Sequence, residues 1–127
     1  MTFNKKMTKA AAAVLAGPSP DVIAVSPMLS NWSFAIKWTG NLALAGWVQD
    51  SPVCHDNEAI VTSPLVFFDQ TRGIARTRSR WYRLGTRQPE TERMCGAFSP
   101  DPAAVDAFLR AQLVLLVEAQ HLFEELQ

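Results

Sequence analysis

Residues 32–48 have the sequence WSFAIKWTGNLALAGWV. Every second residue of its first half is large and apolar, which is the period of a half-buried β-strand. Gly40 and Asn41 then have the turn chemistry of a tight hairpin, and residues 42–48 form a second strand. Gly46 interrupts the alternation there, as a bulge or a close backbone crossing requires. This stretch therefore predicts two antiparallel strands.

Two further strands are expected C-terminal to this hairpin. Residues 59–68 read as the third strand, although Pro64 divides the run and requires an edge or a bulge, because proline cannot donate to a ladder. Asp69 to Gly73 form a turn. Residues 74–84 read as the fourth strand, which Gly85 closes. The pattern predicts a meander of four consecutive strands.

Helices are expected at both ends of the chain. Residues 3–16 are rich in Lys and Ala and predict a short helix that Gly17 stops. Residues 18–27 are punctuated by prolines and read as a loop, with an edge strand as the alternative. Asp101 has the chemistry of an N-cap and Pro102 that of a first helical residue, and apolar residues then recur at helical spacing.

We therefore expect one α+β domain over residues 1–127. Its centre is an antiparallel meander sheet of four to five strands within residues 30–85, with a half-open barrel as the alternative. A long C-terminal helix, residues 101–126, packs on one face of this sheet. Residues 1–20 hold the short N-terminal helix and a linker, and whether they are mobile is left open.

Composition excludes several classes of protein. The chain has 127 residues, of which 48% are hydrophobic and 19% charged, as in a globular protein with one core. Twelve Lys and Arg balance twelve Asp and Glu, so any electrostatic function must be local. Cys54 and Cys95 are too few for a disulfide scaffold, which indicates a reducing compartment, although one bridge between them stays open. With no good secretory signal and no apolar run of bilayer length, we expect a cytoplasmic protein that does not engage a membrane.

Arginine occupies alternate positions of the expected fourth strand. Side chains two residues apart share a face of a strand, so a row of three arginines would stand beside Tyr82. Guanidinium groups bind phosphate in bidentate fashion and aromatic rings stack on bases. A solvated strand face paired with Asp69 and other acidic residues is the competing interpretation. The candidate residues for binding an anion or a partner are Arg76, Arg78, Arg80, Tyr82 and Arg83.

Two short motifs carry a resemblance. Residues 60–65 read IVTSPL and residues 76–85 read RTRSRWYRLG. This pair resembles a family of small uncharacterised bacterial proteins, often found near mobile elements, in which a Thr-Ser strand precedes an Arg-Thr-x-Ser-Arg-x-Tyr-x-Leu-Gly strand. Those proteins often have His-Pro and Asp-Gly in the polar loop, where this chain has Ser51-Pro52 and Asp56-Asn57. The resemblance implies a fold and carries no activity.

No catalytic or metal-binding constellation emerges from the remaining residues. Cys54, His55 and Asp56 are consecutive, and adjacent residues do not usually converge on one ion, while His121 belongs to a distant helix. No spacing places a base beside Cys54, and Ser63 lacks the glycines of a nucleophile elbow. We therefore expect no catalytic residue, no metal and no cofactor.

The sequence thus favours a non-enzymatic binding module. Its partner would be anionic, such as a nucleic acid, or a protein, engaged through the arginine strand. The alternative is a phage or mobile-element inhibitor that binds and occludes a host complex, and a small enzyme built on Cys54 and His55 ranks last.

Two expectations concern the large apolar residues. Trp32, Trp38 and Trp47 fall at strand positions where a core needs bulk, so all three are expected in the core. Residues 113–117 make the C-terminal helix apolar on all sides, so its far side must be covered. Either the N-terminal helix or a second copy in a homodimer would do this, and both readings stay open.

Overall fold

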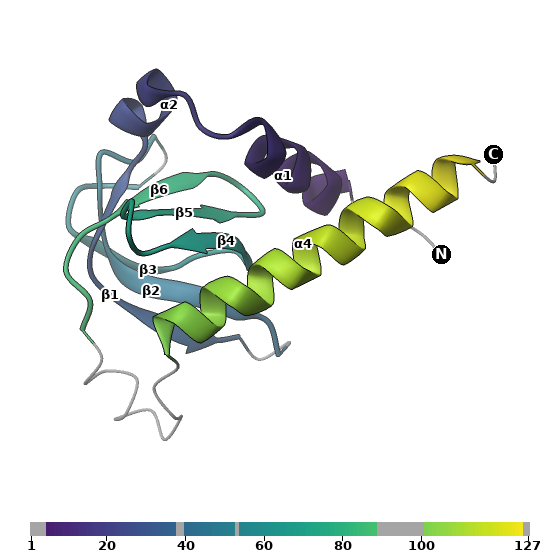
Figure 1. Cartoon of the computed structure of the whole chain (residues 1–127). Helices are drawn as coiled ribbons and strands as arrows, with labels where there is room; N and C mark the ends of the chain where they lie inside the picture. The colour runs from purple at the N-terminus through teal and green to yellow at the C-terminus, as the bar shows by residue number, and fades with distance from the viewer. Residues whose placement is uncertain (1–4, 38–39, 53, 89–100, 126–127) are drawn as a thin grey trace.

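A computed structural model of the chain describes residues 5–37, 40–52, 54–88 and 101–125. Helices lie at both ends of the described chain and six strands lie between them, so the α+β class is confirmed (Figure 1). The elements in chain order are α1 (Lys5–Ala16), α2 (Pro20–Val25), β1 (Met28–Ile36), β2 (Leu42–Gln49), β3 (Glu58–Val61), β4 (Leu65–Asp69), β5 (Ile74–Thr77), β6 (Trp81–Leu84) and α4 (Pro102–Glu125).

The strands form one mixed sheet in the order β3-β2-β1-β6-β5-β4. Two antiparallel meanders, β1-β2-β3 and β4-β5-β6, meet where β1 and β6 pair in parallel. The expected antiparallel sheet of four to five strands is therefore wrong in strand number and in direction. The hairpin of β1 and β2 is confirmed, with Phe34 opposite Leu44, and the extra strands arise because two expected strands are each divided.

The first division falls at Ser63 and Pro64. Thr62 closes β3 onto β2: its N–H donates to the Leu44 carbonyl at 2.8 Å, and its Oγ1 accepts from the Leu44 N–H at 3.0 Å. The chain then turns a corner at Pro64 and continues as β4 at the opposite end of the strand order. Proline favours such a break because it has no N–H for the ladder.

This short link forces the sheet to curl. Consecutive Cα atoms are about 3.8 Å apart, so the chain from Val61 to Leu65 spans at most about 15 Å. The outer strands of a flat sheet of this width would lie about 24 Å apart, at about 4.8 Å per strand. The sheet must therefore curve, and β2 and β4, which are not neighbours in the strand order, contact each other (Figure 1).

The second division falls between Thr77 and Trp81. The Thr77 hydroxyl accepts hydrogen bonds from the N–H groups of Ser79 and Arg80, both at 3.2 Å. The Thr77 N–H in turn donates to the Arg80 carbonyl at 2.9 Å. A side-chain hydroxyl that satisfies the next backbone donors stabilises a turn without glycine or proline. Residues 74–84 are therefore a hairpin of β5 and β6, and the single fourth strand is wrong.

The main hydrophobic core lies on one face of the sheet. Trp32, Phe34 and Phe68 form an aromatic cluster there with ring centroids 5.2 to 5.5 Å apart. Val105 and Leu109 of α4 close this core. A second cluster of Phe67, Ile74 and Trp81 lies on the other face of β4, β5 and β6, where Val14 of α1 and Ile23 of α2 pack against it.

The helices largely follow their sequence signals. The Asp101 carboxylate accepts from the Ala103 N–H at 3.1 Å, so the expected N-cap of α4 is confirmed. Gly17 follows α1 with a positive φ of 74°, as a helix stop requires. The loop expected over residues 18–27 is wrong, because α2 forms there. Ser19 caps it by accepting from the Val22 N–H, and Pro20 is its first residue.

Among the described side chains of α4, the buried ones lie in its first turns. Val105 and Leu109 are buried, whereas Phe108, Val114 and Leu115 are exposed. Although α1 contacts α4, the C-terminal part of α4 extends past the sheet (Figure 1). No helix among the described residues has the length and apolarity to cross a membrane.

Gly46 marks a close approach of β2 to β1, so the backbone crossing expected there is confirmed. A Cβ atom at this position would lie 2.9 Å from Leu29 Cγ and 2.9 Å from the Ser30 carbonyl oxygen. The register of β1 shifts between Ser30 and Ser33, directly opposite.

We expect Gly46→Ala to lower the free energy of unfolding by about 1–3 kcal/mol, because the added methyl group meets backbone that cannot move freely. Gly85→Ala is the matched control, since its Cβ would lie 3.3 Å from the Leu29 carbonyl oxygen and should cost less. Urea unfolding of both variants measures the difference. Equal losses at the two positions would contradict the close approach at Gly46.

Leu109→Ala should lower the free energy of unfolding by about 2–5 kcal/mol, because it empties a buried site between α4 and the sheet. Leu115→Ala, on the same helix but 66% exposed, should change it by no more than about 0.5 kcal/mol. Denaturant titration of the pair tests whether α4 is docked as described.

Candidate functional site

The structure does not form the expected arginine row. Arg76 pairs with Trp81 across β5 and β6, whereas Ala75 pairs with Tyr82. Paired residues share a face and successive residues alternate, so Arg76 and Tyr82 lie on opposite faces of the sheet. The row does not form because the turn at residues 78–80 divides the strand that was expected to carry it.

Arg76 is a buried residue beside Trp81 of the second core cluster. Its side chain is 8% exposed, its Nε donates to the Thr77 carbonyl at 3.0 Å, and its guanidinium lies 5.9 Å from the centre of the Trp81 ring. Burial lowers the pKa of this guanidinium from its ordinary value. Through these contacts the planar guanidinium of Arg76 packs against the aromatic ring of Trp81.

Tyr82 and Arg83 also have internal partners. Tyr82 belongs to the main core, where burial raises the pKa of its hydroxyl, although the nearby charge of Arg80 opposes this shift. Arg83 Nε donates to the Ser26 carbonyl at 2.8 Å, and its Nη2 lies 3.3 Å from an Asp50 carboxylate oxygen. Arg83 therefore joins the end of α2 to the loop after β2.

Arg78 and Arg80 occupy the turn between β5 and β6, and both are half-buried. The Arg78 N–H donates to the Pro64 carbonyl at 3.0 Å, and the Ser79 and Ser63 hydroxyls are 3.0 Å apart. The turn is thus docked onto the corner between β3 and β4. Anion binding by this pair stays a prediction.

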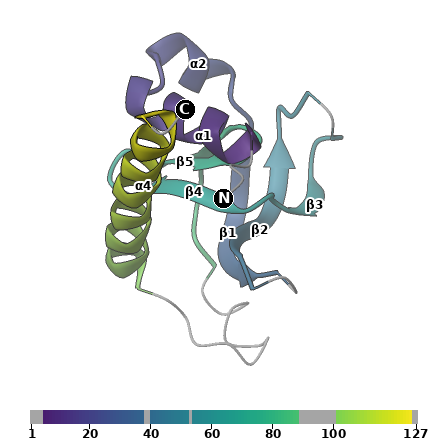
Figure 2. The same ribbon diagram turned by 90° about the vertical axis from the view of Figure 1, so that its right-hand side faces the viewer.

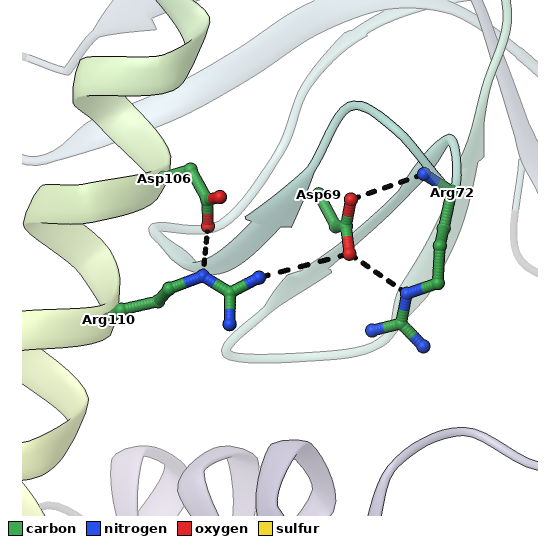
Figure 3. A network of polar contacts seen from close by, with 4 residues as sticks. All are labelled: Asp69, Arg72, Asp106 and Arg110. Carbon is green, nitrogen blue, oxygen red and sulfur yellow. Dashed lines mark hydrogen bonds and ion pairs between the residues drawn. The ribbon is translucent and has the colours of Figure 1, made fainter.

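Two other arginines form the polar network of Figure 3. The Asp69 carboxylate accepts from both Nε and the backbone N–H of Arg72, at 2.8 and 3.1 Å. Arg110 of α4 lies 3.9 Å from the same carboxylate and bonds Asp106 at 2.7 Å. Both guanidiniums also lie over the Phe67 ring, at 5.9 and 5.3 Å. The network fastens α4 to the edge strand β4, which is a structural role.

A different surface has the shape of a binding site. On β1, β2 and β3, the sheet face opposite the main core carries a shallow hollow of about 300 Å³. We call it the Trp47 surface. It is lined by Asn31, Ser33, Ala45, Gly46, Trp47, Ala59, Ile60, Val61 and Gln88.

Small side chains make this hollow, and large ones border it. Ser33 pairs with Ala45, and Ala45 pairs with Val61, so the floor rises little above the backbone. Trp47 lies opposite Ala59 and is 47% exposed, while Val61 is 57% exposed. An exposed tryptophan beside a hollow of small residues is typical of a contact surface.

The tryptophans therefore divide between core and surface. Trp32 is in the core as expected, and its indole N–H donates to the Gly85 carbonyl at 3.0 Å. The core role expected for Trp47 is wrong, because α1 and α2 contact the β4-β5-β6 half of that face. Trp38 lies outside the described residues. Period-two alternation shows that Trp47 belongs to a face but does not show which face is covered.

The loop that begins at Asp50 contains Cys54, His55 and Asp56, the residues weighed above as metal ligands or as a catalytic group. Cys54 is a free, half-buried thiol whose N–H donates to Ser51 Oγ, and the His55 N–H donates to Glu58 Oε2. These bonds shape the loop. Within the described ranges, no three His, Cys, Asp or Glu side chains gather as a metal site would require. Cys95 and the side chain of His121 lie outside the described part.

The pKa of the Asp69 carboxyl is lowered from its ordinary value of 3.8, first by the hydrogen bond from the Arg72 side chain, with burial opposing. Asp69 therefore stabilises the fold above pH 3.8 and loses this effect as pH falls through the lower folded pKa. We expect Asp69→Asn to cost about 0.5–1 kcal/mol at pH 7. Urea titrations from pH 7 to about pH 2 should show wild type and variant converging in acid; a constant gap would refute the charge effect.

Comparisons with known proteins identify a family and no activity. No curated protein and no solved structure matches the chain. A family model described as a family of unknown function, DUF6634, matches residues 1–96, a span that contains α1, α2 and all six strands and ends before α4. Because this match covers more than half of the sequence, the chain belongs to the DUF6634 family of unknown function.

Proposed function

We propose that this protein is a non-enzymatic protein-binding module whose contact surface is the Trp47 surface. The observation that carries the proposal is the half-exposed indole of Trp47 beside a hollow, on the half of the sheet face that the described parts of α1 and α2 leave open. A folded chain gains stability by burying such a residue, so its exposure indicates that a partner covers it. Tryptophan is also enriched among the residues that dominate binding energy at protein interfaces.

Electrostatics favours a protein partner over a nucleic acid at this surface. None of the residues that line the hollow is Lys or Arg. The exposed residue Glu58 begins β3, and the exposed residue Asp56 lies just before this strand. Phosphate backbones are bound by clustered positive charge. A nucleic acid would meet carboxylates at this margin and no compensating cation in the hollow.

The arginine site predicted from the sequence gives anion binding less support in the structure than expected. Arg76 is buried and Arg83 is paired with Asp50, so anion binding would fall to Arg78 and Arg80 in one turn. The inhibitor reading, in which the protein occludes a host complex, needs protein binding and no catalysis. The inhibitor reading stays a prediction, and the Trp47 surface could be the contact surface in that case as well. A homodimer through α4 also stays a prediction.

The matched span adds support. Every residue that lines the Trp47 surface lies between Asn31 and Gln88, inside the span that the family model covers. The exposed apolar residues of α4 lie beyond it. We therefore expect a surface of this kind to recur in other members of the family.

Photocrosslinking tests the proposal. A benzophenone amino acid placed at Val61 should yield one protein adduct of defined mass when the full chain is expressed in its native cells. Trp47→Ser in the same chain should abolish that adduct, because losing a central interface tryptophan weakens binding by about 30-fold or more. Mass spectrometry identifies the adduct.

The control places the same amino acid at Val25, which is 77% exposed on α2 and does not line the hollow. The protein with benzophenone at position 25 should yield no adduct of that mass. Circular dichroism and urea unfolding should show that Trp47→Ser keeps the fold. If positions 61 and 25 give the same adducts, or if Trp47→Ser changes nothing, the Trp47 surface is not the contact surface.

A further inference from the structure

We propose that the partner binds as an extended peptide segment that adds a strand to the free edge of β3, with apolar side chains reaching over Ala59 toward Trp47. This inference rests on the proposed protein-binding function and specifies its mode. It identifies the partner by chemistry: a flexible or edge segment with alternating apolar residues and a basic residue at one end.

The two edges of the sheet differ in coverage. β4 forms one edge, where α4 contacts it and Arg110 reaches Asp69. β3 forms the other edge, and no strand among the described residues pairs with its outer side. Figure 2 shows β3 at one margin of the sheet and α4 at the other. An open edge presents unpaired backbone donors and acceptors to an incoming strand.

The hydrogen-bond pattern identifies the free groups. Thr62 exchanges bonds with Leu44 on β2, and residues along an antiparallel strand alternate between facing the neighbour and facing away. With Ile60 opposite Gly46, Ile60 faces β2 as Thr62 does. The N–H and C=O groups of Ala59 and Val61 therefore point to the open edge, where they can bond the backbone of an added strand.

The side chains of those same residues line the Trp47 surface. Ala59 and Val61 are on the face that bears Trp47, since Ala59 pairs with Trp47 and Val61 with Ala45. Residues of an added strand directly opposite Ala59 and Val61 would place their side chains on this face. Because Ala59 is small, a Leu, Met or Phe side chain can pass over it and contact the indole. Backbone pairing and the apolar hollow thus coincide in one place.

Charge gives the segment a polarity. Glu58, the first residue of β3, and Asp56, just before the strand, are both exposed, and neither forms an ion pair with a described residue. Glu58 pairs with Val48, so its side chain is on the face opposite Trp47, at the same open edge. At the other end of β3 the Lys37 amine donates to the Thr62 carbonyl at 3.0 Å. Opposite charges on neighbouring strands attract. The bound segment should therefore carry Lys or Arg next to Asp56 and Glu58.

The test uses a display library of random linear twelve-residue peptides, selected on the full-length protein and counter-selected on Trp47→Ser. We expect selected peptides to share two apolar residues at spacing two and a basic residue near one end. A selected peptide is then synthesised with one N-methylated amide at each position in turn. Methylation at alternate positions should weaken binding about tenfold, because it removes the bonds to Ala59 and Val61.

Protein variants test the same edge from the other side. Ala59→Pro removes only an N–H that points away from β2, a place where edge strands tolerate proline. It should weaken peptide binding about tenfold or more and leave the thermal unfolding midpoint within a few degrees. Ala59→Ser is the matched control, since it keeps the N–H and a small side chain, and should bind as the wild type does.

The outcomes separate the two proposals. Alternating sensitivity to N-methylation, together with loss on Ala59→Pro, supports strand addition. Peptides that need Trp47 but tolerate every N-methylation and Ala59→Pro overturn strand addition and leave the protein-binding function standing. If the crosslink at Val61 forms and depends on Trp47 but no peptide is selected, the partner presents a folded surface and strand addition is wrong. If no binding of either kind depends on Trp47, both proposals fail.

Discussion

The link formed by Thr62, Ser63 and Pro64 is the constraint on which the rest of the structure depends. It joins β3 to β4, which end the strand order on opposite sides, and it is too short to span a flat sheet of this width. The sheet must therefore curl around one face. That face becomes the main core, where Trp32, Phe34 and Phe68 meet and α4 closes the opening. The docked turn at Arg78, bonded to the Pro64 carbonyl, holds the same corner from the other side.

Curling also decides what is left uncovered. The second face is convex, and among the described residues Val14 of α1 and Ile23 of α2 cover its β4-β5-β6 half, where they pack over the second core cluster. The β1-β2-β3 half has small residues instead, with Trp47 and Val61 as the exposed apolar side chains beside them. The distribution of bulk thus differs between the halves. Large residues occur where a helix packs, and small ones occur where the hollow forms.

Sequence patterns predicted what depends on neighbouring residues. The β1-β2 hairpin, the stop at Gly17 and the Asp101 cap each require only a few adjacent side chains, and each was correct. The division at Thr77 was missed because its turn uses a threonine hydroxyl and neither glycine nor proline, although the Thr-x-Ser spacing offered a signal. Pro64 was correctly predicted to interrupt the third strand, but an interruption alone does not show that the chain continues at the opposite edge of the sheet.

The candidate site failed for a related reason. Alternation places residues on faces, but which face is covered depends on helices far away in the sequence. Arg76 was expected on an exposed face and is buried beside Trp81, whereas Trp47 was expected in the core and is exposed. Both errors follow from the positions of α1 and α2, since α2 was not predicted and where α1 docks was not known. Local alternation does not show whether a helix from elsewhere in the sequence covers a given residue, so it could not show that Arg76 is buried and Trp47 exposed.

The open edge of β3 could pair with the same edge of a second copy and cause aggregation, and the sequence of β3 disfavours such pairing. Two such edges paired in parallel would set Glu58 beside Glu58, which repel each other. In antiparallel pairing the strand is limited by Pro64, which lacks an N–H and lies just beyond Thr62. β3 is also only four residues long, so a second copy gains few bonds. A basic segment of another protein escapes the first of these penalties and gains the apolar contact at Trp47. The features that protect the edge from self-association therefore leave it available to a partner of opposite charge.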